Sequence, residues 1–260
     1  MDMAHTVAGF LVGGVVGMTG VGGGSLMTPI LVLLFGYAPQ TAIGTDLLFA
    51  CVTKGVGWAI HDHHGTVDRQ VLRRLICGSI PAAVITSVYI HGHPLAARGG
   101  RELVALIGAA IILTSAGLIC KPLMLRPGLA PRPAAQDFFM KHQALLTVLA
   151  GAVVGVMVSL TSVGAGALGT VMLVYLYPLR MKAAQLVGTD ITHAIPLTLV
   201  AGAGHLLVGN VDLGLLAKLL AGSIPGIIIG SLIVTRLPDA LVRNALAVVL
   251  LLLGLKMFLA

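Results

Sequence analysis

Two long stretches of the chain contain no Asp, Glu, Lys or Arg: residues 3–45 and residues 143–179. Each is interrupted by a glycine-rich break, the first break at 20–25 and the second at 162–166. Glycine costs about 1 kcal/mol relative to alanine inside a helix, so four glycines in five positions do not form an ordinary helix interior. At membrane depth a break is tolerated only where the backbone is buried in protein or lines a cavity. Two broken apolar segments in matching halves therefore predict a transporter's substrate site.

Each break is followed by three apolar segments that predict membrane-spanning helices. Their ranges are 40–60, 75–92 and 102–120 in the first half, and 183–207, 214–235 and 240–259 in the second. Each is close to the ~20 residues that cross the hydrocarbon core. Residues 3–45 would form one helix about 65 Å long, too long for a single crossing. The broken segments therefore predict a re-entrant hairpin, or two short crossings that meet near the break.

The two halves carry the same short motifs at a constant spacing. Gly44-Thr45-Asp46 recurs 144 residues later as Gly188-Thr189-Asp190. The same spacing relates His61 to His205, Gly65–Asp68 to Gly209–Asp212, and Gly78–Pro81 to Gly222–Pro225, whereas the breaks match at a spacing of 142. We infer an internal duplication, with a first repeat at 1–120 and a second at 142–260. A proline-rich linker at 121–141 joins them.

The distribution of Lys and Arg predicts how the halves are oriented. If each broken segment returns to the side it entered, eleven Lys and Arg outside the predicted spans fall on one face and four on the other. If each crosses once, the split is nine against six. The positive-inside rule favours the first arrangement, with the linker cytoplasmic and both termini outside. The predicted fold is an all-α polytopic membrane protein of two inverted repeats, each a broken segment plus three transmembrane helices.

Composition agrees with a membrane protein. Apolar residues make up 57% of the chain and charged residues 10%, against about 25% charged in soluble domains. The net charge of +7 is interpreted as cytoplasmic loops rather than a nucleic-acid surface. The start of the chain shows no cleavable signal pattern. The three cysteines have no metal-ligand spacing and are interpreted as apolar filler. We expect a multi-pass protein of the bacterial inner membrane, without metal or cofactor.

The breaks also predict the binding chemistry. A half-helix is expected to begin near Gly24–Ser25 and another near Gly166–Ala167, with free backbone N–H groups and a positive dipole end facing the gap. Two such ends form an anion site without a fixed cation. The expected substrate-binding residues are Thr19, Gly20, Gly22, Gly23, Gly24, Ser25, Thr161, Ser162, Gly164 and Gly166. The alternative is that the glycines only allow close helix packing.

Asp46 and Asp190 are the acidic residues well inside predicted spans. Such residues face a cavity or a partner, so they are candidates for ion coupling or gating. Equally, each carboxylate can hold a glycine-rich loop by accepting its N–H groups. Lys54 joins the coupling or gating candidates; it can attract an anion, pair with Asp46 or snorkel to the inner interface, and snorkelling is favoured. His193 is expected to be a packed, neutral histidine.

Other chemistry is weakly represented. His61-Asp62-His63-His64 resembles a metal cluster, but adjacent ligands lack the spacing of a typical site. Neither glycine-rich break is a nucleotide loop, because no Lys-Ser/Thr follows and no strand precedes. No Ser, His and Asp arrangement has a catalytic spacing, so the chain is not predicted to be an enzyme.

The sequence resembles the TauE/SafE sulfite-exporter family. The resemblance rests on Gly20 through Pro29, on Gly44-Thr45-Asp46, and on their counterparts from Ser162 and Gly188. It implies a total of seven to nine helices arranged in two related modules. It also implies transport of sulfite, sulfonates or related sulfur-containing anions. The chain departs from the family pattern in the second break, where Ser162 and Ala165 replace glycines.

The predicted function is a secondary transporter that exports a small sulfur-containing anion such as sulfite or an organosulfonate. Its partners are that anion and the lipid bilayer, and no nucleic acid. The inside-negative potential would itself favour anion export. One alternative is a channel-like anion pore. Another is a membrane-bound enzyme or accessory protein of sulfur metabolism that uses the histidines at 61–64.

Overall fold

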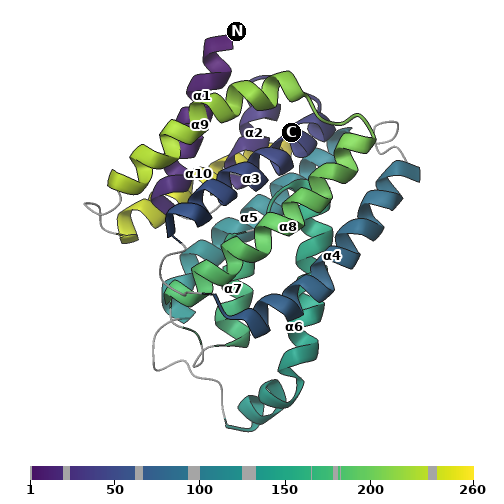
Figure 1. Cartoon of the computed structure of the whole chain (residues 1–260), viewed down its shortest axis with the longest axis vertical. Helices are drawn as coiled ribbons and strands as arrows, with labels where there is room; N and C mark the ends of the chain where they lie inside the picture. Colours follow the sequence, from purple (N-terminus) through teal and green to yellow (C-terminus); the bar gives the residue numbers. More distant parts are fainter. Residues whose placement is uncertain are drawn as a thin grey trace.

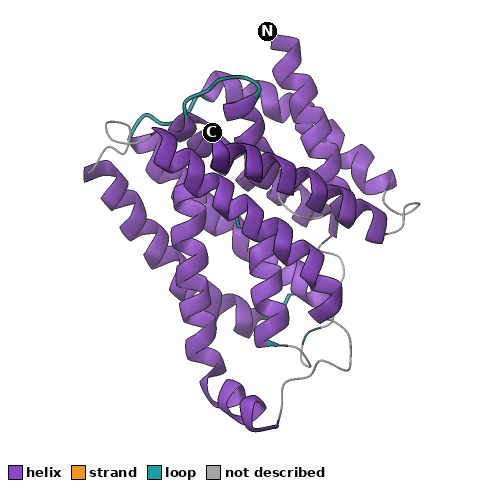
Figure 2. Cartoon of the chain, turned by 180° about the vertical axis from the view of Figure 1, so that it is seen from behind, coloured by secondary structure: helices purple, strands orange, loops and turns teal. Residues whose placement is uncertain are grey.

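A computed structural model describes residues 2–19, 24–61, 67–92, 100–124, 133–164, 166–177, 181, 183–233 and 239–260. Within these residues the chain forms ten α-helices and no strand (Figures 1 and 2). The helices are α1 (Asp2–Thr19), α2 (Gly24–Leu33), α3 (Pro39–His61), α4 (Arg69–Gly92), α5 (Gly100–Met124), α6 (Pro133–Thr161), α7 (Ala167–Leu176), α8 (Ala183–Leu207), α9 (Leu213–Ile233) and α10 (Asp239–Leu259). The six segments predicted after the breaks are confirmed as helices, namely α3, α4, α5, α8, α9 and α10.

Six of the described helices are long and apolar enough to cross a membrane: α4, α5, α6, α8, α9 and α10. Helix α3 has 23 residues but is not in this group, and it carries Asp46 and Lys54. Large apolar side chains cover the outside, with Ile85 and Leu252 among them. Such a surface suits lipid rather than water. The predicted multi-pass membrane protein is confirmed.

The predicted linker at 121–141 is helical where it is described. Helix α5 runs on to Met124, and α6 begins at Pro133. Pro133 occupies the first turn of α6, where the absence of an N–H group has no cost. Residues 125–132 lie outside the described part of the chain, and the cytoplasmic location of the linker stays a prediction.

The second broken segment folds back as a hairpin. The Gln143 side-chain amide donates a hydrogen bond to the Leu176 carbonyl (2.7 Å), and the hydroxyls of Thr147 and Tyr177 are 2.8 Å apart. The end of α7 therefore lies beside the early part of α6, on the side from which α6 enters. With 10 residues, α7 is about 15 Å long, roughly half of a ~30 Å hydrocarbon core.

The first broken segment has the same shape. Helix α2 also has 10 residues, and the chain that follows it returns to the start of α1. There the His5 ring stacks on Phe35 with centroids 4.5 Å apart, and its Nε2 lies 3.3 Å from the Tyr37 hydroxyl. Each broken segment is therefore a long helix followed by a half-length helix that turns back.

Each hairpin packs against a helix from the other half of the chain. Helix α1 lies along α9, and α6 lies along α4 (Figure 1). Gly9 meets Leu219 and Gly17 meets Ile227, so α1 and α9 run parallel. Gly151 of α6 meets Leu75 of α4 in the same way. Residues 9 and 151 differ by 142 and residues 75 and 219 by 144, so the two interfaces are related by the same spacings as the sequence motifs.

Matching helices that contact each other run antiparallel. In the α5–α10 pair, Gly108 lies against Gly254, and the Ser115 hydroxyl donates to the Ala247 carbonyl (2.8 Å). In the α3–α8 pair, residue numbers likewise rise on one helix as they fall on the other: Gly44 meets His205, and the Cys51 thiol lies 3.7 Å from the Ile195 carbonyl. If a two-fold axis relates the two helices of such a pair, it must run perpendicular to them, because an axis parallel to the helices would leave them parallel.

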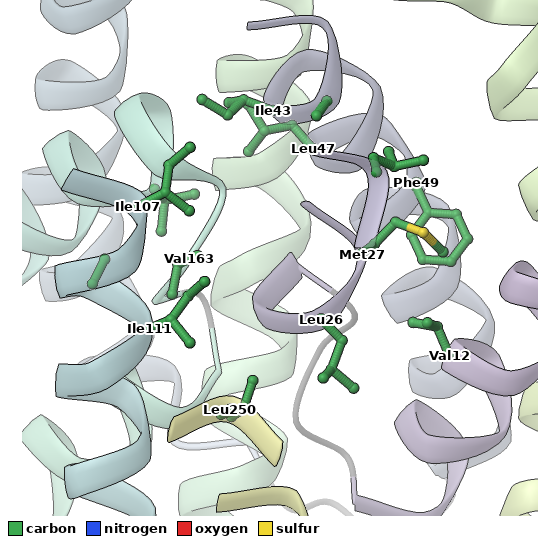
Figure 3. Packing of buried hydrophobic residues seen from close by; sticks show 14 of the residues in the cluster. Val12, Leu26, Met27, Ile43, Leu47, Phe49, Ile107, Ile111, Val163 and Leu250 are labelled. Atoms are coloured by element: carbon green, nitrogen blue, oxygen red, sulfur yellow. The ribbon is translucent and has the colours of Figure 1, made fainter. Parts of the chain in front are cut away.

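Buried apolar side chains fill the space around the two breaks. In Figure 3 they come from α1, α2, α3, α5, α10 and the second break, where Val163 belongs to the same cluster as Ile107 and Ile111 of α5. Leu26 and Met27 bring the first turn of α2 into this cluster. The start of α2 and the described part of the second break are therefore enclosed by protein, as backbone without regular hydrogen bonds requires at membrane depth.

The two Gly-Thr-Asp motifs each bind the other half of the chain. The Thr45 hydroxyl accepts a hydrogen bond from the Asp212 backbone N–H (3.1 Å), and the Thr189 hydroxyl accepts one from the Asp68 N–H (3.0 Å). We expect Thr45→Val and Thr189→Val each to lower the free energy of unfolding by about 1 kcal/mol, because a partly buried N–H loses its acceptor. Chemical unfolding in detergent measures this, and clearly unequal costs would contradict the matched geometry.

Candidate functional site

The half-helices begin at the predicted residues. Helix α2 starts at Gly24 and α7 at Ala167. Gly20, Gly22 and Gly23 of the first break lie outside the described residues. In the second break the backbone is left-handed at Ser162 (φ 58°), Gly164 (φ 114°) and Gly166 (φ 156°), so it leaves the helical path at once.

The predicted hydroxyl donors behave differently from one another. The Thr19 hydroxyl donates to the Val15 carbonyl (2.8 Å), and the Thr161 hydroxyl donates to the Met157 carbonyl (2.7 Å). These two hydroxyl hydrogens are therefore used within their own helices. Ser25 is buried in the first turn of α2. The Ser162 hydroxyl is also buried, and it has no hydrogen-bond partner among the described residues.

Asp46 lies where the two hairpins meet. Its side chain is 0% exposed, and its Oδ2 accepts a hydrogen bond from the Thr28 hydroxyl on α2. The Ser162 hydroxyl of the second break is close to the same carboxyl group, although it falls short of hydrogen-bond geometry. Oδ1 of Asp46 has no hydrogen-bond partner in the described part of the chain. A residue of the first half thus contacts α2 and lies beside the break of the second half.

Asp190 occupies the matching position on α8, with different neighbours. It is 3% exposed, and its Oδ1 lies directly against Gly169 in the first turn of α7. The absence of a side chain at Gly169 makes room for the carboxylate. Asp190 also interacts electrostatically with Lys54, which comes from α3.

The interpretation of Lys54 as a snorkelling residue is wrong. Its side chain is only 3% exposed, and its electrostatic partner is Asp190 rather than Asp46. The antiparallel crossing explains this, since Cys51 already lies level with Ile195 and Lys54 therefore falls near the level of Asp190. Burying both charges is tolerated when they compensate each other.

Two histidines of α8 lie close to this centre. His193 is buried beside Lys54, and its Nε2 is 2.8 Å from the Ser79 hydroxyl of α4. His205 is buried as well, with Nε2 at 2.9 Å from the Ser159 carbonyl. The predicted packing of His193 is therefore confirmed. Asp62, His63 and His64 lie outside the described residues, as does the side chain of His61, which ends α3.

The sequence reasoning missed three contacts of the site. These are the hydrogen bond from Thr28 to Asp46, the packing of Asp190 against Gly169, and the electrostatic interaction of Lys54 with Asp190. Thr28 was recognisable, because it lies one turn into the half-helix and within the Gly20–Pro29 motif. The electrostatic contact between Lys54 and Asp190 was not recognisable without the crossing of α3 and α8. The arrangement therefore brings the starts of two half-helices, buried hydroxyls, the Asp46 carboxyl group and the charges of Lys54 and Asp190 into one part of the molecule.

Comparison with known proteins agrees with this architecture. The family described as "Sulfite exporter TauE/SafE" matches residues 6–257. The protein named "Probable membrane transporter protein YjnA" from Bacillus subtilis (strain 168) is 37% identical, over 99% of this chain and 100% of that one. "Probable membrane transporter protein YdhB" of the same organism is 26% identical, over 91% and 92%. No solved structure shows significant similarity to the chain. The chain belongs to the TauE/SafE sulfite exporter family of membrane transporters.

Proposed function

We propose that the chain is a secondary transporter that exports a small sulfur-containing anion, sulfite or an organosulfonate. The observation that carries this is the meeting of both hairpins at Asp46, where Thr28 of α2 and Ser162 of the second break face one carboxyl group. An anion between the two breaks would lie near the positive ends of α2 and α7. The buried Ser162 hydroxyl would supply a further donor. The choice of sulfite as the first substrate is based on the description of the family, "Sulfite exporter TauE/SafE".

The proposal includes two inverted repeats that rock around the site. Its support is the antiparallel packing of α5 with α10 and of α3 with α8, together with the matched α1–α9 and α4–α6 contacts. For helices that cross a membrane, such a two-fold axis lies in the membrane plane. Each hairpin would then open toward its own side of the membrane, a geometry suited to alternating access.

Sulfite efflux from liposomes that contain the purified protein tests this function. We expect saturable sulfite efflux, faster than that of sulfate or chloride and accelerated by sulfite on the opposite side. Acceleration by external sulfite identifies a carrier, whereas a channel-like pore shows none. Absence of flux for sulfite and for small sulfonates alike would contradict the proposed function.

Gly164→Ala tests whether the second break forms the site. The φ of 114° at Gly164 is strained for any L-residue with a side chain, so the break is expected to shift. We predict that sulfite efflux falls by at least about tenfold. A loss of about 1.4 kcal/mol in the free energy of anion binding already has this effect. The matched control is Gly209→Ala, at a surface turn with φ 80° and open space around the added methyl group. Equal losses of efflux in Gly164→Ala and Gly209→Ala would mean that backbone strain causes both, and would contradict a site at the second break.

A further inference from the structure

The two intramembrane aspartates, although they arise from the same motif, have different electrostatic surroundings. Lys54 of α3 supplies a buried positive charge to Asp190. The position in the second repeat that matches Lys54 is 54 plus 144, and it holds Thr198. Asp46 therefore lacks the cation that the two-fold relation would otherwise provide. Its surroundings consist of hydroxyl and backbone groups, from Thr28 and Ser162.

The titratable groups on the helices packed against α3 either bind partners other than Asp46 or lie elsewhere on those helices. On α8, His205 bonds the Ser159 carbonyl and His193 lies at Ser79 and Lys54. Before α9, the Asp212 carboxylate caps its own helix by accepting the Leu215 N–H (2.9 Å). The remaining ones are Asp190 on α8, Lys218 on α9, and on α5 the exposed Arg101, Glu102 and Cys120, together with Lys121, whose side chain lies outside the described part of the structure. Within the described residues, no cation pairs with the Asp46 carboxyl group.

A carboxylate without a cation is costly to bury, and the group avoids this cost by binding a proton. The same carboxylate would repel an anion held at the breaks. Once protonated, Asp46 is neutral and gains a donor, and Oδ1 is the oxygen that has no hydrogen-bond partner among the described residues. Proton binding and anion binding at this place therefore favour each other.

We propose that Asp46 carries a proton together with the transported anion, while Asp190 and Lys54 form a permanent ion pair that does not titrate during transport. This inference rests on the proposed function. One consequence concerns the driving force: a monoanion that moves with one proton carries no net charge. The membrane potential then acts only on anions with two or more negative charges, such as the dianion of sulfite.

Proton counting in liposomes tests the proposal. Sulfite efflux and internal pH are recorded together, for the wild type and for Asp46→Asn, which imitates the protonated carboxyl group. Sulfite brings a proton of its own at neutral pH, so the informative quantity is the difference between the two proteins at one pH. We expect Asp46→Asn to exchange sulfite but to move about one proton fewer per sulfite. Equal proton counts in the two proteins would overturn the proposal.

A paired comparison separates Asp46 from Asp190. The double variant Lys54→Met/Asp190→Asn removes the ion pair without leaving a buried charge, and whatever its rate, we expect the wild-type number of protons per sulfite. A lower number in the double variant would assign the proton to Asp190 and overturn the proposal for Asp46. If the wild type moves neither sulfite nor a sulfonate, the proposed function fails instead.

A second measurement needs no variant, and it decides the matter if Asp46→Asn does not fold. Methanesulfonate has a fixed single negative charge near neutral pH. We expect its efflux through the wild type to be unchanged when a potassium gradient and valinomycin impose a membrane potential. Efflux that follows the imposed potential would mean that the monoanion moves without a proton, which would overturn the proposal.

Discussion

Lys54→Met is expected to lower the free energy of unfolding by about 3–5 kcal/mol, because it leaves the buried Asp190 carboxylate without its cation. Both side chains are 3% exposed, so neither solvent nor lipid headgroups can replace the partner. Methionine keeps a similar apolar length, which limits the packing change. Unfolding of the purified protein in detergent, followed by its helical circular dichroism, measures the loss.

The double variant Lys54→Met/Asp190→Asn is the matched control for this change. Replacing both members of a buried ion pair is often nearly neutral, whereas removing one is strongly destabilising. We therefore expect the double variant to recover most of the stability lost in Lys54→Met. A double variant as unstable as the single one would mean that Lys54 acts through packing and that its charge pairing with Asp190 contributes little.

Residue spacing alone predicted much of the fold. The matched motifs and the lengths of the apolar segments located the helices, since a duplicated chain repeats both its turns and its spans. The start of α7 at Ala167 followed from the second break, because a glycine-rich backbone leaves its N–H groups free. The length of residues 3–45, too long for one crossing, predicted a broken segment but left open a re-entrant hairpin or two short crossings.

The partners across the two halves were not predictable in this way. Which residue lies level with Lys54 depends on the register and direction in which α3 crosses α8, and neither is encoded locally. The same holds for Ser162 and Asp46, which are 116 residues apart in the sequence. The sequence did carry one relevant signal: Thr198 stands where the duplication would place a second lysine, so the two aspartates could not be equivalent.

Gly13→Ala is expected to destabilise the protein by about 1–3 kcal/mol or more, the usual cost of overpacking. A methyl group at Gly13 would run into the Ser223 carbonyl of α9, and backbone cannot move aside as a flexible side chain can. The α1–α9 contact fastens the first hairpin to the second half of the chain. We therefore expect lower yield of folded protein and earlier thermal unfolding in detergent.

Gly14→Ala is a control one residue away on the same helix. The nearest atom to its added methyl group is the Gly226 carbonyl oxygen at 3.8 Å, an ordinary contact. The second repeat already has a side chain at the matching position, Val156, whereas the counterpart of Gly13 is Gly155, which meets the Ser79 carbonyl. Gly14→Ala should be neutral or slightly stabilising, since alanine favours a helix over glycine by about 1 kcal/mol. Similar losses of stability in Gly13→Ala and Gly14→Ala would mean that α1 does not approach α9 through the face that carries Gly13. That result would contradict the matched packing of the two hairpins.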